Sequence, residues 1–125
     1  MGADVDIADE TFLVADRADL ATRFANPGLW RSWWPELELR VDENRGAAGM
    51  RWYVHGRLTG TAEIWLEPWR DGVIVHWFVR ARLVSGDAGR LRDTMIRAYK
   101  RRMHGLKDEL ERTRAPGMPR SRASG

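Results

Sequence analysis

The chain has 125 residues, of which 43% are hydrophobic and 31% charged, and these values indicate a single globular domain of a soluble protein. It has no cysteine, which excludes disulfides, thiolate catalysis and cysteine-bound metals and fits a reducing, cytoplasmic location. The net charge of +3 is uneven, because residues 1–87 carry 10 basic and 14 acidic side chains whereas residues 88–125 carry 11 basic and 4 acidic.

Two short helices are predicted after a first strand over residues 4–14. Asp16 is placed to cap the first helix, over residues 17–25, with its side-chain oxygen. Asn26-Pro27-Gly28 interrupts that helix, and Pro27 suits the first turn of a second one that ends before Pro35.

Four further segments alternate apolar and polar residues with a period of two, which is typical of half-buried strands. These segments span residues 36–42, 50–57, 61–67 and 73–83. Turns are expected at 44–46, at 58–60 and at 68–72, where Asp71-Gly72 is a hairpin signal. Pairing across these turns is predicted to set Trp52 opposite Leu66 and Leu66 opposite Val73.

A long helix is predicted from Ser85 or Asp87 to about residue 112, because apolar residues recur there every three or four positions. Its opposite face is basic and could bind nucleic acid or an anionic membrane, although a solvated helix face explains the charge more simply. Residues 113–125 are rich in Pro, Gly and Ser and are expected to form a disordered basic tail, so the predicted domain spans residues 1–112. No apolar run approaches the roughly 20 residues of a membrane span.

One face of the predicted sheet should pack against the long helix, with aromatic and methionine side chains between them. Such side chains suit an apolar ligand like a polyketide, a quinone or a lipid, but the same residues can simply fill a core. The candidate ligand-binding residues are Trp33, Trp52, Val54, Ile64, Val75, Trp77, Met95 and Tyr99.

The opposite face is too aromatic for an ordinary solvated surface. Tyr53, Trp65, Ile74 and Phe78 lie on it and form a candidate homodimer interface. The alternative is that these aromatics are scattered and shielded by arginine stems.

The predicted pairing also forms a row of His55, Glu63 and His76 on that opposite face. Strand spacing sets the two histidine backbones roughly 10 Å apart, so cross-strand charge pairing explains the row better than a metal site. No metal and no other cofactor is expected.

No catalytic residue is predicted. The sequence has no nucleophile-elbow, phosphate-loop, dinucleotide-binding or zinc-protease motif. The inward positions carry no titratable group, which acid–base catalysis requires. His104 is interpreted as an ordinary helix residue.

The order of elements resembles the helix-grip fold of the START-like (SRPBCC) superfamily, which includes polyketide cyclase/dehydrase-type proteins. The residues that carry this likeness are 15–20, 26–35 and 60–79, and the likeness covers roughly residues 4–112. It implies an α+β fold in which a curved antiparallel sheet grips the C-terminal helix around an apolar cavity. The family usually has seven strands, whereas five are predicted here, so a central hairpin is missing between Val54 and Ala62. The implied cavity is therefore smaller, partly filled or more open.

Three functions remain open on the sequence. The preferred one is a binding module for a hydrophobic small molecule. The others are a dimeric interaction protein with a filled cavity, and a cyclase-like enzyme that acts by orienting its substrate. Nucleic acid is not an expected partner, because the outer aromatics are flanked by Glu63 and Glu67.

Overall fold

The computed structural model describes residues 2–112, which form one five-stranded antiparallel sheet, three α-helices and one short 3-10 helix. The strands lie in the order β1-β5-β4-β3-β2. This architecture confirms the predicted helix-grip α+β fold with five strands, two short helices and a long C-terminal helix. The elements are β1 (Ala3–Leu13), α1 (Arg17–Phe24), α2 (Pro27–Trp33), β2 (Glu38–Asn44), η1 (Gly46–Ala48), β3 (Gly49–His55), β4 (Leu58–Trp69), β5 (Gly72–Leu83) and α3 (Ala88–Arg112).

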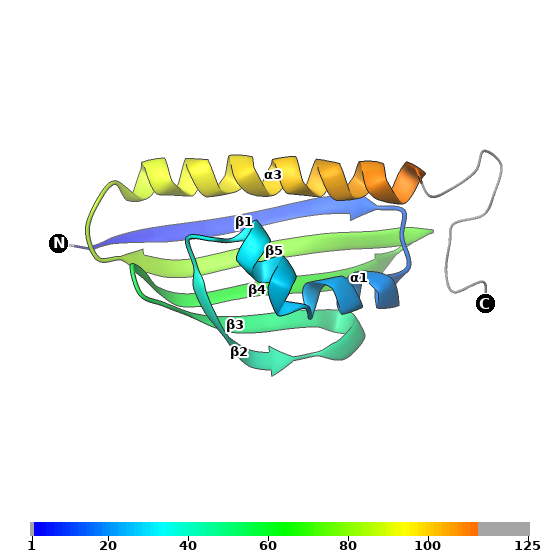
Figure 1. Ribbon diagram of the computed structural model, residues 1–125, viewed down its shortest axis with the longest axis horizontal. Coiled ribbons are helices and arrows are strands. Elements are labelled where there is room, and N and C mark those ends of the chain that lie inside the picture. The colour runs from blue at the N-terminus through cyan, green and yellow to red at the C-terminus, as the bar shows by residue number, and fades with distance from the viewer. Residues whose placement is uncertain (1, 113–125) are drawn as a thin grey trace.

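The three helices cover one face of the sheet. Figure 1 shows α3 running along β1 while α1 and α2 lie in front of the strands on the β4 and β3 side. Because successive strand residues point to opposite faces, every second side chain of β3, β4 and β5 is directed toward the helices. The hydrophobic core therefore lies between this inner face and the helices.

Local sequence signals account for two of the three helix starts. The Asn26 side chain accepts a hydrogen bond from the Gly28 N–H at 2.8 Å, with Pro27 in the first turn of α2. Asp87 accepts a hydrogen bond from the Arg90 N–H at 3.0 Å at the start of α3. The predicted Asp16 cap is wrong as a side-chain contact, since Asp16 has the extended backbone of a cap but makes no capping hydrogen bond.

The predicted strand registers are wrong, although the assignment of residues to faces is right. In the structure Leu66 lies opposite Val75 rather than Val73, and Trp52 lies opposite Ala62 rather than Leu66. The first pairing differs from the prediction by two residues and the second by four. Because side chains alternate with a period of two, an even shift keeps every residue on its own face.

The turn between β3 and β4 explains the larger shift. The expected loop at 58–60 does not exist, because the chain turns at Gly56 and Arg57, where Gly56 has a φ of 92°. Gly60 instead lies within β4, and a Cβ there would clash with the backbone carbonyl of Arg80 on β5. The glycine thus permits a close approach of two strands rather than a turn.

The sequence also predicts a C-terminal tail and the absence of a membrane span. The predicted tail at 113–125 lies outside the described residues. Among helices of the described part, none combines the length and apolar character needed to cross a bilayer.

Candidate functional site

A cluster of aromatic rings joins the inner face of the sheet to α2 and α3. The Tyr99 ring from α3 stacks on the Trp77 ring from β5 with 4.1 Å between ring centroids. Trp34, which follows α2, lies nearly parallel to both rings at 6.1 Å and 6.4 Å. Trp33 meets Tyr99 edge-on at 5.9 Å, and Trp52 from β3 meets Trp34 at 5.6 Å. We call these five residues the aromatic cluster.

The structure places all eight candidate ligand-binding residues on the helix-covered side of the sheet. Trp33 is half-buried. The other seven are buried: Trp52, Val54, Ile64, Val75, Trp77, Met95 and Tyr99. Trp30 also belongs to this region, because its ring lies 5.2 Å from that of Trp52. The alternation of apolar and polar residues identifies the buried strand residues. It could not identify Trp30, because Trp30 lies in the short helix α2 and not in a strand.

Three polar groups in the aromatic cluster are buried without a hydrogen-bond partner among the described residues. They are the indole N–H groups of Trp34 and Trp52 and the hydroxyl of Tyr99. The indole N–H of Trp30 is different, since it donates to the Phe24 carbonyl at 2.6 Å. A buried polar group without a partner costs about 1–3 kcal/mol, and three such groups in one place are rare in a native core.

A carboxylate lies on the same face, contrary to the prediction that inward positions carry no titratable group. Asp9 on β1 is opposite Trp77 in the strand register, and its side chain is 13% exposed. Lys100 Nζ on α3 lies 2.6 Å from Asp9 Oδ1, and the Thr11 hydroxyl donates to Oδ2 at 3.3 Å. The sequence does not reveal this position, because apolar and polar residues do not alternate regularly along β1. Asp9 therefore could not be distinguished from the exposed Asp4 and Asp6.

Burial, with a smaller contribution from the Asp9 carboxylate, raises the pKa of the Tyr99 phenol well above its ordinary value. Tyr99 is therefore a neutral hydroxyl at physiological pH. It can donate one hydrogen bond and accept another.

The outer face of the sheet carries a second aromatic group, built around His76. The predicted row of His55, Glu63 and His76 is wrong, because the register sets Trp65 and Glu10 on either side of His76. The His76 ring is buried under the Trp65 ring at 4.3 Å. Its Nε2 lies 2.9 Å from Glu67 Oε1, and its Nδ1 lies 3.4 Å from Glu10 Oε2.

The four candidate interface residues all lie on this outer face. Tyr53 and Trp65 are 40% and 38% exposed, and Ile74 and Phe78 are half-buried. Phe12, which the sequence interpretation missed, is also exposed on this face and pairs with Ile74 in the strand register. Across residues 2–112, no group of three or more metal-ligating side chains is arranged to hold a metal ion.

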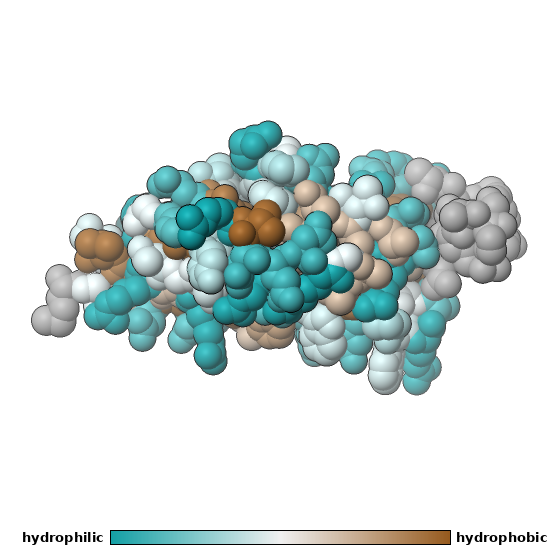
Figure 2. All heavy atoms as spheres, turned by 90° about the horizontal axis from the view of Figure 1, so that it is seen from below, coloured by the Kyte–Doolittle hydropathy of each residue, from teal (hydrophilic) through white to brown (hydrophobic). Residues whose placement is uncertain are grey.

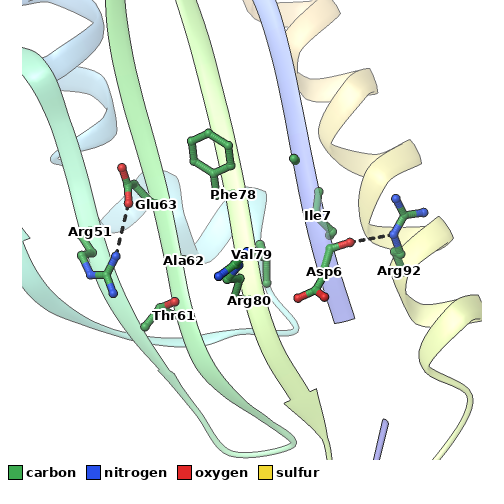
Figure 3. Close-up of a pocket in the computed structure, with 11 residues that line it drawn as sticks. Asp6, Ile7, Arg51, Thr61, Ala62, Glu63, Phe78, Val79, Arg80 and Arg92 are labelled. Atoms are coloured by element: carbon green, nitrogen blue, oxygen red, sulfur yellow. Dashed lines mark hydrogen bonds and ion pairs between the residues drawn. The ribbon is translucent and has the colours of Figure 1, made fainter. Parts of the chain in front are cut away.

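A groove of about 600 Å³ hollows the outer face beside these aromatics (Figure 3). Phe78 lies at one end, and the polar residues Thr61, Glu63, Arg51 and Arg80 line it together with Asp6 and Arg92. Arg51 is bound to Glu63 at 3.4 Å and to Asp42 at 3.0 Å. Charges of both signs make this groove unsuited to an apolar ligand, which favours a mostly apolar lining.

The surface seen from the β2 side is predominantly hydrophilic. Figure 2 shows hydrophobic atoms there as separate spots among polar ones rather than as a continuous band. The strongly hydrophobic atoms on this side are therefore few and are separated by polar ones.

Known proteins resemble this chain in fold. No family model and no curated protein matches its sequence. The solved structure of an Aha1 dimer from Colwellia psychrerythraea superposes with a TM-score of 0.58 at 12% identity, covering 86% of this chain and 96% of that one. The Mll3558 protein from Rhizobium loti gives 0.57 at 13% identity, covering 88% and 99%. DR_A0006 from Deinococcus radiodurans gives 0.55 at 11% identity, covering 81% and 98%.

The unpartnered indole of Trp34 can be tested against the partnered indole of Trp30. Replacing either residue by Phe removes a similar volume, but Trp30→Phe also leaves the Phe24 carbonyl without its donor. Trp34→Phe instead removes a donor that had no partner. We expect Trp34→Phe to be less destabilising by about 2 kcal/mol in urea unfolding followed by circular dichroism. Equal losses would show that the Trp34 N–H is satisfied in solution.

The raised pKa of Tyr99 predicts a loss of stability at high pH. The unfolded chain releases the phenolic proton near its ordinary pKa of about 10, while the folded protein retains it. The free energy of unfolding should therefore fall as pH rises above about 10. Tyr99→Phe should lack this part of the decline when both proteins are unfolded in urea at about pH 8 and about pH 11. Parallel declines in the two proteins would contradict the burial of an unpartnered phenol.

Proposed function

We propose that this protein binds an apolar small molecule between the inner face of the sheet and helices α2 and α3. The single observation that supports this most strongly is the set of three buried polar groups without partners in the aromatic cluster. A core that only fills space gains nothing from such groups, whereas a ligand with oxygen acceptors would satisfy them. The eight residues from Trp33 to Tyr99 named as ligand-binding in the sequence analysis would line this site.

The ligand would enter by separating rings that now touch one another. Trp33 is the accessible member of the cluster, whereas Trp34 beside it is only 2% exposed. Helix α2 ends between these two residues. Trp33 is half-buried, and Trp34 has left the helical conformation, with φ of −131° and ψ of 63°. Moving these two rings away from Tyr99 would expose the three unpartnered groups at once. A flat molecule would then replace the ring contacts that are lost.

The geometry supports binding better than catalysis. Both Asp9 carboxylate oxygens are engaged, one by Lys100 and the other by Thr11. The Tyr99 phenol is held neutral by burial, which raises its pKa. A cyclase-like enzyme that orients a reactive chain is the alternative, and in it Asp9 and Tyr99 would be the groups able to move a proton.

Native mass spectrometry of protein purified from its own host tests the proposal. We expect an adduct of small-molecule mass that is lost on denaturation. Tyr99→Phe should reduce its occupancy several-fold, because the inner hydroxyl is removed. Tyr53→Phe removes a hydroxyl from the outer face and serves as the matched control, which should keep the adduct. A protein without any adduct, or equal occupancy in both variants, would refute the proposal.

Homodimerisation through the outer face is a second candidate function. Phe12, Tyr53 and Trp65 are each about two fifths exposed on this face. The end of this face near the start of β5 carries Glu10 of β1 and Glu67 of β4. The end near the last residues of β5 carries Arg80, which has no ion pair among residues 2–112. A two-fold axis lying in the interface across the strands would set the acidic end of one copy against Arg80 of the other. The structure of the Aha1 protein with this fold is also that of a dimer.

A charge placed in the outer aromatic group should separate the two copies. Trp65→Glu is expected to lower the mass in solution to that of one chain, measured by size-exclusion chromatography with light scattering, and to leave the circular dichroism spectrum unchanged. Val84→Glu places the same charge at an exposed position beyond β5 and should leave the mass unaltered. If the wild-type protein is already a monomer at the same concentration, homodimerisation through the outer face is refuted.

A further inference from the structure

One guanidinium nitrogen of Arg102 on α3, Nη1, is buried and has no hydrogen-bond partner among the described residues. Other cations of α3 are differently placed. Lys100 binds Asp9 at 2.6 Å, and Arg92 donates to the Asp6 carbonyl at 2.8 Å. A buried charged donor without a partner costs more than a neutral one. Arg102 is half-buried as a whole, and it is the one charged group among the four unpartnered groups in residues 2–112.

The position of Arg102 on the helix directs it to the side of α3 that faces α1 and α2. Residues three apart are neighbours on one helix face, so Arg102 lies beside Tyr99. Glu109, two turns further along the same flank, forms an ion pair of 2.8 Å with Arg23 of α1. Trp33 of α2 contacts Tyr99 from this same region. Arg102 thus lies on the flank of α3 that faces α1 and α2, next to Tyr99 of the aromatic cluster.

All four unpartnered groups can donate a hydrogen bond, and one of them is positively charged. Two carboxylates of this region are already engaged, since Asp9 is bound to Lys100 and Glu109 to Arg23. Arg102 makes no ion pair among residues 2–112, so it contributes an unpaired positive charge. The chemical complement of such a set is an anion with several oxygen acceptors.

We propose that the ligand of this site is a flat apolar molecule that carries a carboxylate. The inference rests on the proposed binding function and specifies the class of ligand. The carboxylate binds Arg102, and further oxygens of the ligand accept hydrogen bonds from the neutral donors Trp34, Trp52 and Tyr99. Arginine suits this role because its guanidinium stays charged and forms strong, directional hydrogen bonds with carboxylates.

Two aromatic probes of nearly equal shape test this assignment, naphthoate, which is an anion, and naphthamide, which is neutral. Isothermal titration calorimetry with the full-length wild-type protein should show naphthoate binding about tenfold more tightly or better. Arg102→Gln should abolish that preference, because it should weaken naphthoate binding at least tenfold more than naphthamide binding. Arg101→Gln removes an exposed arginine from the solvent side of α3 and should alter neither affinity. The wild-type comparison needs no variant, so it stands even if Arg102→Gln does not fold.

The outcomes separate this inference from the function on which it rests. Equal affinity of the wild-type protein for both probes would overturn the acidic-ligand assignment and leave the binding function in place. Equal effects of Arg102→Gln and Arg101→Gln on naphthoate would also overturn it, because a surface charge would then account for the preference. Absence of binding of either probe up to about 1 mM would count against both proposals.

Discussion

The stacking of Tyr99 on Trp77 is the contact on which the arrangement of this protein depends. Helix α3 runs along the edge strand β1, so it reaches the middle of the sheet only through side chains that extend over β5. Trp34 lies nearly parallel to both rings and brings the segment after α2 into the same cluster. Large aromatic side chains bury roughly 150–250 Å² each, so a few of them can hold a narrow sheet and its helices together.

The composition of this cluster separates it from an ordinary core. Leucine or phenylalanine would fill the same space without leaving a polar atom unsatisfied. Trp30 shows that an indole of this chain can be buried with its N–H bonded to a backbone carbonyl. Trp34, Trp52 and Tyr99 lack that arrangement, and the Nη1 atom of Arg102 on α3 is likewise buried without a partner among residues 2–112. Burial of these unpartnered groups therefore lowers the stability of the fold.

The two aromatic groups of the protein lie on opposite faces of one sheet and are independent of each other. Neighbouring residues such as Trp52 and Tyr53, or Ile64 and Trp65, contribute alternately to the inner and outer face. A substitution on one face therefore leaves the packing of the other largely intact. The inner face meets the helices, whereas the outer face surrounds His76 with Trp65, Glu10 and Glu67. A binding function and a dimer interface can coexist on such a sheet.

The period-two alternation of β3, β4 and β5 was sufficient to assign Trp52, Ile64, Val75 and Trp77 to the buried face, and the three-to-four spacing of α3 was sufficient to add Met95 and Tyr99. These assignments are right although the predicted strand registers are wrong, because the registers differ from the observed ones by two and four residues. An even shift keeps each side chain on the same face of the sheet. The partners of His76, the inward position of Asp9 and the unpartnered state of Trp34 could not be predicted in this way. Each depends on which strand or helix lies beside the residue, and periodicity describes a segment without its neighbours.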